Sequence, residues 1–241
     1  MNIVSSGPRA PRAHVSTPEW WNRAAGTDYW AFFGLESTIA AAGSSALLSD
    51  AGWTTTSLAE TAGTGADFLA TGDRANPAHI LTNAGSDLLQ SPPVFGDYGH
   101  AQMAASILGY QPTRLVCEFY GAMTVHSADE STLTGWGLVE AGGAAGTAND
   151  RMAWVSTDGT NFLCSSAADS DLGATDDANW HVFRVELSNA VAAGTDMSTW
   201  YIDGTSQGTL DLQTDLFPVS FGMFASTTNR PALAWIHIWY E

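Results

Sequence analysis

Acidic side chains are the first residues in this sequence that could do chemistry. Asp169 and Asp171 stand two positions apart, and Asp176 and Asp177 follow shortly after. Carboxylate oxygens in a flexible loop are preferred ligands of calcium, so Asp169 and Asp171 are candidate metal ligands. The segment lacks the twelve-residue spacing and the final Glu of an EF-hand. We therefore favour a solvated acidic loop without a cofactor, with calcium as the alternative.

Catalytic groups are the second possibility that the residue types raise. Asp211 and Asp215 would share one face of a strand that continued so far, and paired carboxylates can cleave glycosidic bonds. A solvated strand edge is the favoured interpretation. Acyl transfer would need a nucleophile beside a histidine, and no nucleophile-elbow motif accompanies any of the six histidines. These are His14, His79, His100, His126, His181 and His237.

Aromatic residues alternate with aliphatic ones at the C-terminal end. Trp235, His237 and Trp239 interleave with Ala234, Ile236 and Ile238, so a strand here has one aromatic and one aliphatic face. Aromatic rings stack on sugars, which makes Trp235, His237 and Trp239 candidates for glycan binding. Because tryptophan is usually largely buried, a core or subunit-interface role is the favoured interpretation.

Charge and composition restrict the partners. The 241 residues include 25 acidic and 8 basic ones, all eight of them arginine, for a net charge of −17. Residues 1–23 carry +2 and the remainder −19, from 5 Arg against 24 acidic residues. The body should repel nucleic acid and anionic membranes. Two cysteines, Cys117 and Cys164, form no disulfide framework and are expected to be buried free thiols. No signal peptide and no run of 18 apolar residues is visible, which predicts a soluble protein made in a cytoplasm.

Both cysteines and the C-terminal aromatic residues named above are expected to lie on β-strands, because apolar and polar residues alternate along much of the chain and turn-forming residues separate these runs. The clearest pattern is at Trp180–Leu212, where runs 180–187 and 199–202 are followed by the turn signal Asp203-Gly204. A second Asp-Gly pair, at 158–159, predicts another hairpin. Further strands are expected at 29–35, 79–82, 114–125, 134–140, 219–225 and 232–241, with the one expected helix at 100–108.

The N-terminal segment has a different character. Residues 1–27 contain three prolines and the pair Trp20-Trp21, without helical or strand periodicity. We interpret them as an extended N-terminal arm that packs on its own domain or on a neighbouring subunit, with Arg9 and Arg12 available to an acidic partner. Residues 28–241 are then one all-β domain.

The C-terminal half carries a family resemblance. Trp180-His-Val-Phe-Arg-Val-Glu, Thr199-Trp-Tyr-Ile-Asp-Gly, Pro218-Val-Ser-Phe-Gly-Met and the closing Ala-Trp-Ile-His-Ile-Trp-Tyr resemble the concanavalin A-like lectin/glucanase (laminin-G-like) superfamily over about residues 113–240. The resemblance implies an antiparallel jelly-roll β-sandwich whose last strand lies beside the first. Glucanases of this superfamily carry E-x-D-x-x-E on one strand. That run is absent here, so we expect no enzyme activity.

The leading functional hypothesis is a non-enzymatic virion structural protein. The proline-rich arm and the Ala/Gly/Thr-rich body are similar in style to virion proteins of tailed phages, which predicts a capsid or tail decoration protein that docks through Arg9, Arg12, Trp20 and Trp21. Its partners would be other virion subunits, including copies of itself in a homo-oligomer. It would be made in the host cytoplasm and reside in the virion. The alternative is a lectin-like carbohydrate-binding module.

Overall fold

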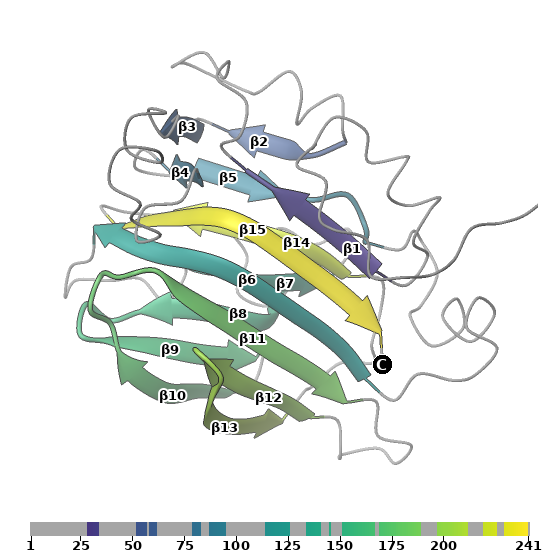
Figure 1. The fold of residues 1–241 in the computed structure, drawn as a ribbon, viewed down its shortest axis with the longest axis vertical. Helices are drawn as coiled ribbons and strands as arrows, with labels where there is room; N and C mark the ends of the chain where they lie inside the picture. Colours follow the sequence, from purple (N-terminus) through teal and green to yellow (C-terminus); the bar gives the residue numbers. More distant parts are fainter. Residues whose placement is uncertain are drawn as a thin grey trace, which may run out of the picture.

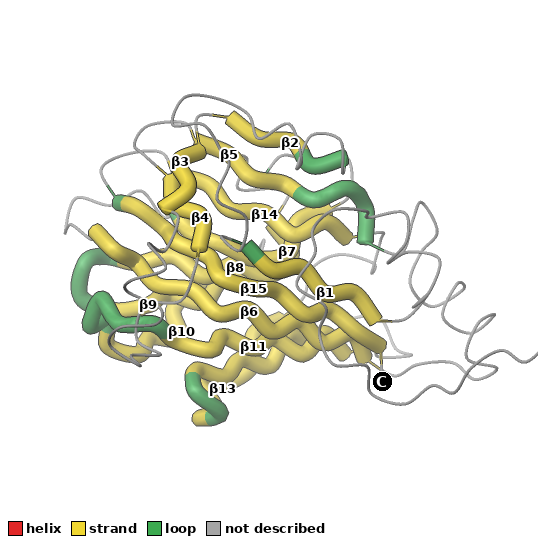
Figure 2. Tube along the Cα trace, turned by 45° about the horizontal axis from the view of Figure 1, so that its top comes forward, coloured by secondary structure: helices red, strands yellow, loops and turns green. Residues whose placement is uncertain are grey.

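The described part of the computed structural model consists entirely of strands and their connections. It comprises residues 28–33, 52–56, 58–61, 79–82, 87–94, 114–125, 134–140, 145, 151–166, 169–188, 197–211, 219–225 and 229–240. These residues form fifteen strands in two antiparallel sheets, one in front of the other in Figure 1. Figure 2, in which strands are yellow, shows the same two layers from another direction. The structure thus confirms the antiparallel jelly-roll sandwich expected from the sequence.

The front sheet in Figure 1 is built around the last strand. Its order is β13-β12-β11-β6-β15-β4-β3. β6 pairs along one side of β15, and both β4 and β1 pair along its other side. The first strand therefore lies beside the last, as the resemblance implies. The bounds are β1 (Asp28–Phe32), β3 (Leu58–Thr61), β4 (His79–Thr82), β6 (Arg114–Val125), β11 (His181–Ser188), β12 (Met197–Ile202), β13 (Thr205–Asp211) and β15 (Arg230–Tyr240).

The back sheet has the order β10-β9-β8-β7-β14-β5-β2. The bounds are β2 (Thr54–Thr56), β5 (Asp87–Gln90), β7 (Gly135–Glu140), β8 (Arg151–Thr157), β9 (Asn161–Ser166), β10 (Asp169–Thr175) and β14 (Val219–Ala225). Two glycines of β7 let β8 approach closely. A Cβ on Gly135 or Gly137 would stand 1.8 or 2.0 Å from a carbonyl oxygen of β8, and their φ angles are +156° and +152°.

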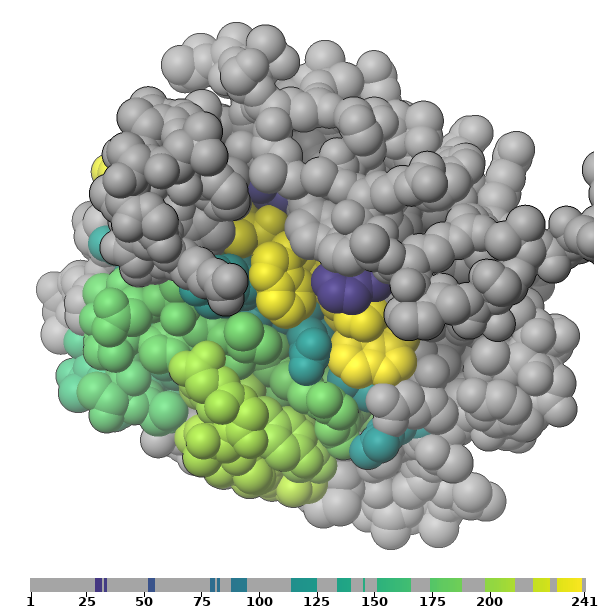
Figure 3. All heavy atoms as spheres, viewed as in Figure 1, coloured from purple at the N-terminus to yellow at the C-terminus, as the bar shows by residue number. Residues whose placement is uncertain are grey.

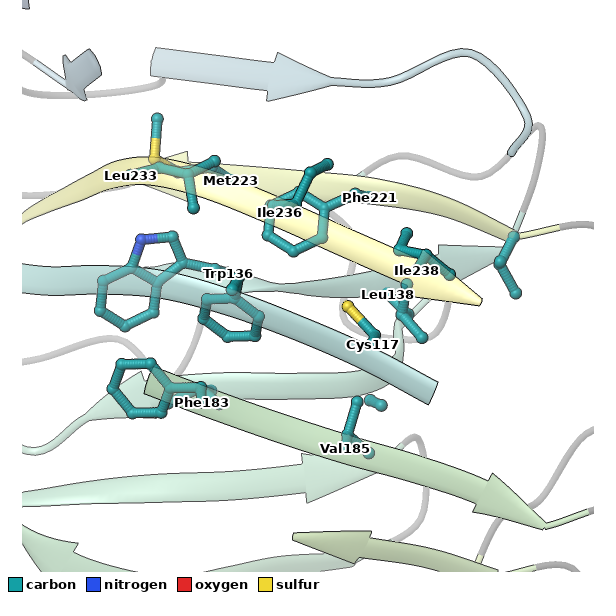
Figure 4. Packing of buried hydrophobic residues seen from close by; sticks show 14 of the residues in the cluster. Cys117, Trp136, Leu138, Phe183, Val185, Phe221, Met223, Leu233, Ile236 and Ile238 are labelled. Atoms are coloured by element: carbon teal, nitrogen blue, oxygen red, sulfur yellow. The ribbon is translucent and has the colours of Figure 1, made fainter. Parts of the chain in front are cut away.

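Large aromatic side chains fill the space between the sheets. The rings of Phe119 and Phe183 from the front sheet meet Phe221 from the back sheet, with Phe119 at 5.1 Å from Phe183 and 5.3 Å from Phe221. Trp136 of β7 crosses the core, and its indole Nε1 donates a hydrogen bond to the Ala232 carbonyl of β15 at 3.0 Å. Figure 4 shows Trp136, Phe183 and Phe221 between the two layers. Burial of this apolar surface is the main force holding the sheets together.

Both hairpins predicted from Asp-Gly pairs are present. β12 and β13 are joined through Asp203 and Gly204, with φ angles of 50° and 76°, the two left-handed residues of a type I′ turn. Asp158 and Gly159 lie in the connection between β8 and β9. The expected strands at 114–125 and 219–225 have the predicted bounds.

One predicted loop is a strand. The acidic segment 168–177 was expected to be a loop, but residues 169–175 form β10, which pairs with β9 through a register shift between Ser170 and Leu172. An edge strand needs only one hydrogen-bonded neighbour, and charged residues suit an edge because they discourage further pairing. The expected helix at 100–108 and the arm at 1–27 lie outside the described residues.

Candidate functional site

A β-bulge in β15 decides which side chains of the last strand face outward. Opposite β6, Leu233 pairs with Gly121 and Trp235 with Tyr120, so Ala234 has no partner on that strand. The extra residue resets the alternation of side chains. Leu233 and Ile236 both lie in the core between the sheets (Figure 4), although three positions separate them.

The aromatic side of β15 consequently lies on the outer face of the front sheet. Ile236 and Ile238 are fully buried, whereas Trp235, His237 and Trp239 are partly exposed. The core interpretation of these three rings is therefore wrong: the aliphatic side fills the core. The aromatic side extends across the face of the sheet, where Figure 3 shows yellow atoms of β15 beside purple atoms of β1 and teal atoms of β6.

His237 is the centre of a stack of three rings. Its imidazole lies 3.7 Å from the indole of Trp30 on β1, with an angle of 12° between the planes. On the other side it lies 4.1 Å from the indole of Trp239, at 21°. Trp30 also contacts Trp235 at 5.9 Å. The three rings of the stack are in close, nearly parallel contact, so they hold one another in place by direct packing.

The stack continues across the sheet to β11 and β4. Tyr120 of β6 lies 6.1 Å from Trp235, and Trp180, just before β11, lies 5.2 Å from Tyr120. His79 of β4 meets Trp180 edge-on at 5.0 Å. All are partly exposed. We call the seven rings together the aromatic surface: His79, Trp180, Tyr120, Trp235, Trp30, His237 and Trp239.

A cluster of paired charges borders the aromatic surface at Trp239. The guanidinium of Arg184 lies 5.6 Å from the Trp239 ring, within cation–π range. Arg184 also forms ion pairs with Glu186 and, at 3.5 Å, with Glu118. Arg114 binds Glu186 at 2.8 Å. The strand register explains the cluster, because Glu118 lies opposite both Arg184 on β11 and His237 on β15.

A histidine clamp lies near the Trp180 end. His181 Nδ1 is 2.6 Å from Asp203 and Nε2 is 2.8 Å from Asp177. Two carboxylates accept at both ring nitrogens, so the geometry fits the imidazolium form. Burial lowers the pKa of His181, but the hydrogen bonds with Asp203 and Asp177 outweigh burial and the pKa is raised. The hydrogen bond with His181 is the largest cause that lowers the pKa of Asp177 to about 2. The clamp joins the β12–β13 turn to the loop that carries Trp180.

The other predicted site residues are not brought to this surface. Arg9, Arg12, Trp20 and Trp21 lie outside the described residues. Asp169 and Asp171 belong to β10 on the edge of the back sheet, and Asp211 ends β13, while residues 212–218 are not described.

The described residues contain neither a metal-binding cluster nor a membrane-spanning helix. No group of three or more His, Cys, Asp or Glu that could hold a metal ion occurs among the described residues, so the calcium alternative stays a prediction. Within those residues no helix could cross a membrane. Cys117 and Cys164 are buried and free, as predicted.

Sequence reasoning missed most of this surface. Alternation along residues 114–125 already placed Glu118 and Tyr120 on one face, opposite Cys117 and Phe119. The sequence alone did not show how β6 pairs with β11 and β15, and this pairing is what places Glu118 and Tyr120 beside residues of those strands. The missed residues are Trp30, His79, Tyr120 and Trp180 of the aromatic surface and Arg114, Glu118, Arg184 and Glu186 of the charge cluster beside it.

Comparisons with known proteins give only remote similarities. No family model matches the sequence, and no curated protein is significantly similar. A botulinum neurotoxin type C chain, from a study of cell entry through two ganglioside molecules, is 10% identical with a TM-score of 0.46, covering 91% of this chain and 48% of that one. The carbohydrate recognition domain of Emp47p is 9% identical with a TM-score of 0.44 and coverage of 90% and 96%.

A carbohydrate esterase from the Shiga toxin-encoding bacteriophage phi24B is 12% identical, with a TM-score of 0.45 and coverage of 90% and 98%. This chain spans less than half of the neurotoxin chains, 48% for type C and 41% for the serotype D/C binding domain. At these identities and TM-scores, no activity and no site residue is transferred to this chain.

Proposed function

We propose that this protein is a lectin-like carbohydrate-binding module that uses the aromatic surface. The observation that carries the proposal is the continuous row of seven partly exposed rings on the outer face of the front sheet. Outward-facing rings on a soluble protein are costly unless they serve an interaction. The C–H faces of sugar rings pack well on indole and phenol rings, and the neighbouring carboxylates can accept hydrogen bonds from hydroxyl groups.

Rigidity of the surface supports binding. Trp30, His237 and Trp239 stack on one another, and Arg184 lies over the edge of this stack. Rings already fixed in the free protein lose little conformational entropy when a ligand covers them. The same rings can contact sugars without rearrangement of the sheet.

A glycan array probed with the whole chain tests the proposal. We expect binding of at least one glycan, and a loss of at least tenfold in affinity for Trp239→Ala. Gln207→Ala, in β13 of the same sheet, is the matched control and should bind like the wild type. The proposal fails if no glycan binds, or if both variants bind like the wild type.

A protein interface is the main rival for these rings. Light scattering after size-exclusion chromatography separates the two roles. If Trp239→Ala converts an oligomer into a monomer without changing glycan binding, the surface is a subunit interface.

Binding without catalysis is the second part of the proposal. Two carboxylates, Glu118 and Glu186, do meet on the sugar-facing side, but Arg184 engages both and Arg114 engages Glu186 as well. Neither is presented as an unengaged acid and base pair of the kind that hydrolysis needs. Incubation with the bound glycan should release no new reducing or unsaturated ends. If the wild type forms product and Glu118→Gln does not, the protein is an enzyme.

The virion role remains a separate prediction, because residues 1–27 on which it depends lie outside the described part of the chain. Deletion of residues 1–27 tests it by mass measurement and electron microscopy. Assembly of the full chain, with itself or with capsid subunits, should be lost in the deletion variant. If both forms stay monomeric and neither attaches to particles, the assembly role is rejected.

A further inference from the structure

We propose that the aromatic surface selects extended, neutral glycan chains and discriminates against acidic ones. This inference rests on the carbohydrate-binding function proposed above and adds the substrate class. It follows from how the charges beside the rings are paired and from how the rings are spaced.

The arginines beside the rings already form ion pairs with carboxylates. Arg184 is shared by Glu118 and Glu186, and Arg114 is bound to Glu186 at 2.8 Å. Recognition of a uronic acid normally uses a bidentate arginine, and a sugar carboxylate here would have to compete with these glutamates. Glu186 is only 13% exposed, so leaving it without its partners would be costly.

The net charge of the chain acts in the same direction. The chain as a whole carries −17, which repels polyanions over the short distances that salt permits. His181 adds no cation to the aromatic surface, because its ring packs on the core residues Phe162 and Phe183 and both of its nitrogens are paired with carboxylates. The paired charges at the Trp239 end and the net charge thus both oppose an acidic ligand.

Neutral sugars can use the same cluster without breaking it. A carboxylate accepts about four hydrogen bonds, and the arginines occupy only part of that capacity on Glu118 and Glu186. Hydroxyl groups of a sugar stacked on Trp239 can donate to the remaining lone pairs. Each glutamate is then held in position by arginine and can bind hydroxyls selectively.

The spacing of the rings indicates a chain of several sugars. Trp235 and Trp239 are four strand positions apart, about 13 Å along β15. Tyr120 and Trp180 continue the row beyond Trp235 towards β11. A single sugar would cover one or two of these rings, whereas an oligosaccharide covers the row. Affinity should therefore rise with ligand length.

Calorimetric titration of the whole chain tests both parts. The probes are cello-, laminari- and manno-oligosaccharides of two to six sugars, and hexamers of mannuronate and galacturonate, at pH 8 in 50 and 150 mM NaCl. We expect at least one neutral series to bind, with affinity increasing at least tenfold from disaccharide to hexasaccharide. Both uronate hexamers should bind at least tenfold more weakly than the best neutral hexasaccharide.

A charge variant sharpens the result. Glu186→Gln leaves Arg114 and Arg184 less compensated, and we expect it to gain at least threefold affinity for the uronates. Asp158→Asn removes the same charge from an exposed turn of the back sheet and should change neither affinity. Thermal unfolding of both variants checks that the fold is intact.

The outcomes separate this inference from the proposed function. If a uronate binds as tightly as the neutral chains or more tightly, or if disaccharides bind as well as hexasaccharides, the inference fails while the binding function stands. If no probe of either class binds, the inference fails for these glycans and the array result decides whether the binding function fails with it.

Discussion

The imidazole of His237 lies face to face with the indole of Trp30, 3.7 Å away, so the last strand is joined to the first on the outside of the sheet as well as by backbone pairing. Trp239 covers the opposite face of the same imidazole. A histidine thus separates two indoles at a fixed distance. Its role in the surface is to position its neighbours.

Replacing this histidine should loosen the surface without unfolding the protein. In His237→Ala, Trp30 and Trp239 lose the ring between them, and we expect a three- to tenfold loss of glycan affinity with a loss of about 1 kcal/mol in unfolding free energy. Calorimetry and urea denaturation measure the two quantities. His79→Ala, at the end of the row, should have a smaller effect on binding. Equal effects of the two variants would argue against a positioning role for His237.

The hydrogen bond across the core should matter for stability and not for binding. Trp136→Phe removes the donor to the buried Ala232 carbonyl and part of the ring volume. We expect a loss of about 2–4 kcal/mol in unfolding free energy, from the unpaired carbonyl and the cavity. Trp239→Phe, on the outer face, should cost less than about 1 kcal/mol. Chemical denaturation checks both, and equal losses would contradict the assignment of faces.

Stability should depend on pH through the His181 clamp. The folded pKa of His181 is raised, so its contribution is complete below the ordinary value of about 6.5 and is lost as the pH rises through the folded pKa. The pKa of Asp177 is lowered to about 2, so its contribution is present above about 3.8 and is lost as the pH falls towards 2. The clamp is strongest between these limits.

His181→Gln tests the clamp, because it removes the titrating group. Urea unfolding is measured at pH 5, 6, 7 and 8. As the pH rises over this range, the unfolding free energy of the wild type should fall by about 1 kcal/mol or less through the clamp, since both carboxylates are about half exposed. The variant should lack that part of the pH dependence. Identical profiles for the two proteins would show that the clamp does not contribute.

Both thiols should be unreactive until the protein unfolds. Burial raises the pKa of the Cys117 thiol well above its ordinary value and that of Cys164 to about 12. The thiolate is the reactive form, so a colorimetric thiol reagent should detect almost none in the native state at pH 8 and two per chain in guanidinium chloride. Rapid native labelling of either cysteine would contradict the packing of the core.

The sequence predicted those elements whose structure is determined locally. Alternation and an Asp-Gly pair are sufficient to predict the hairpin of β12 and β13, because the turn sets the pairing next to it. The register shift between Trp200 and Tyr201, further along the same pair, was not predicted. The strand β10 was missed because its acidic, small-residue composition is typical of a loop and its pairing with β9 is a tertiary effect.

The candidate site was predictable only in part for the same reason. Trp235, His237 and Trp239 were identified as one face of a strand, but which face was outward depended on Ala234. Trp30 and Tyr120 join them through pairing between strands distant in sequence. Contacts of this kind leave no periodic signal within either strand.

The bulge at Ala234 has a consequence for how this strand can vary in length. Deleting Ala234 would leave Leu233 and Trp235 as consecutive positions opposite Gly121 and Tyr120, so the rings of Trp235, His237 and Trp239 would still face outward. A deletion of one residue after Trp235 has no extra residue to absorb it, and it would exchange the inner and outer faces of the rest of the strand. The final strand should therefore accept replacements on its outer side and the loss of Ala234 during evolution, but no single-residue deletion between Trp235 and Trp239.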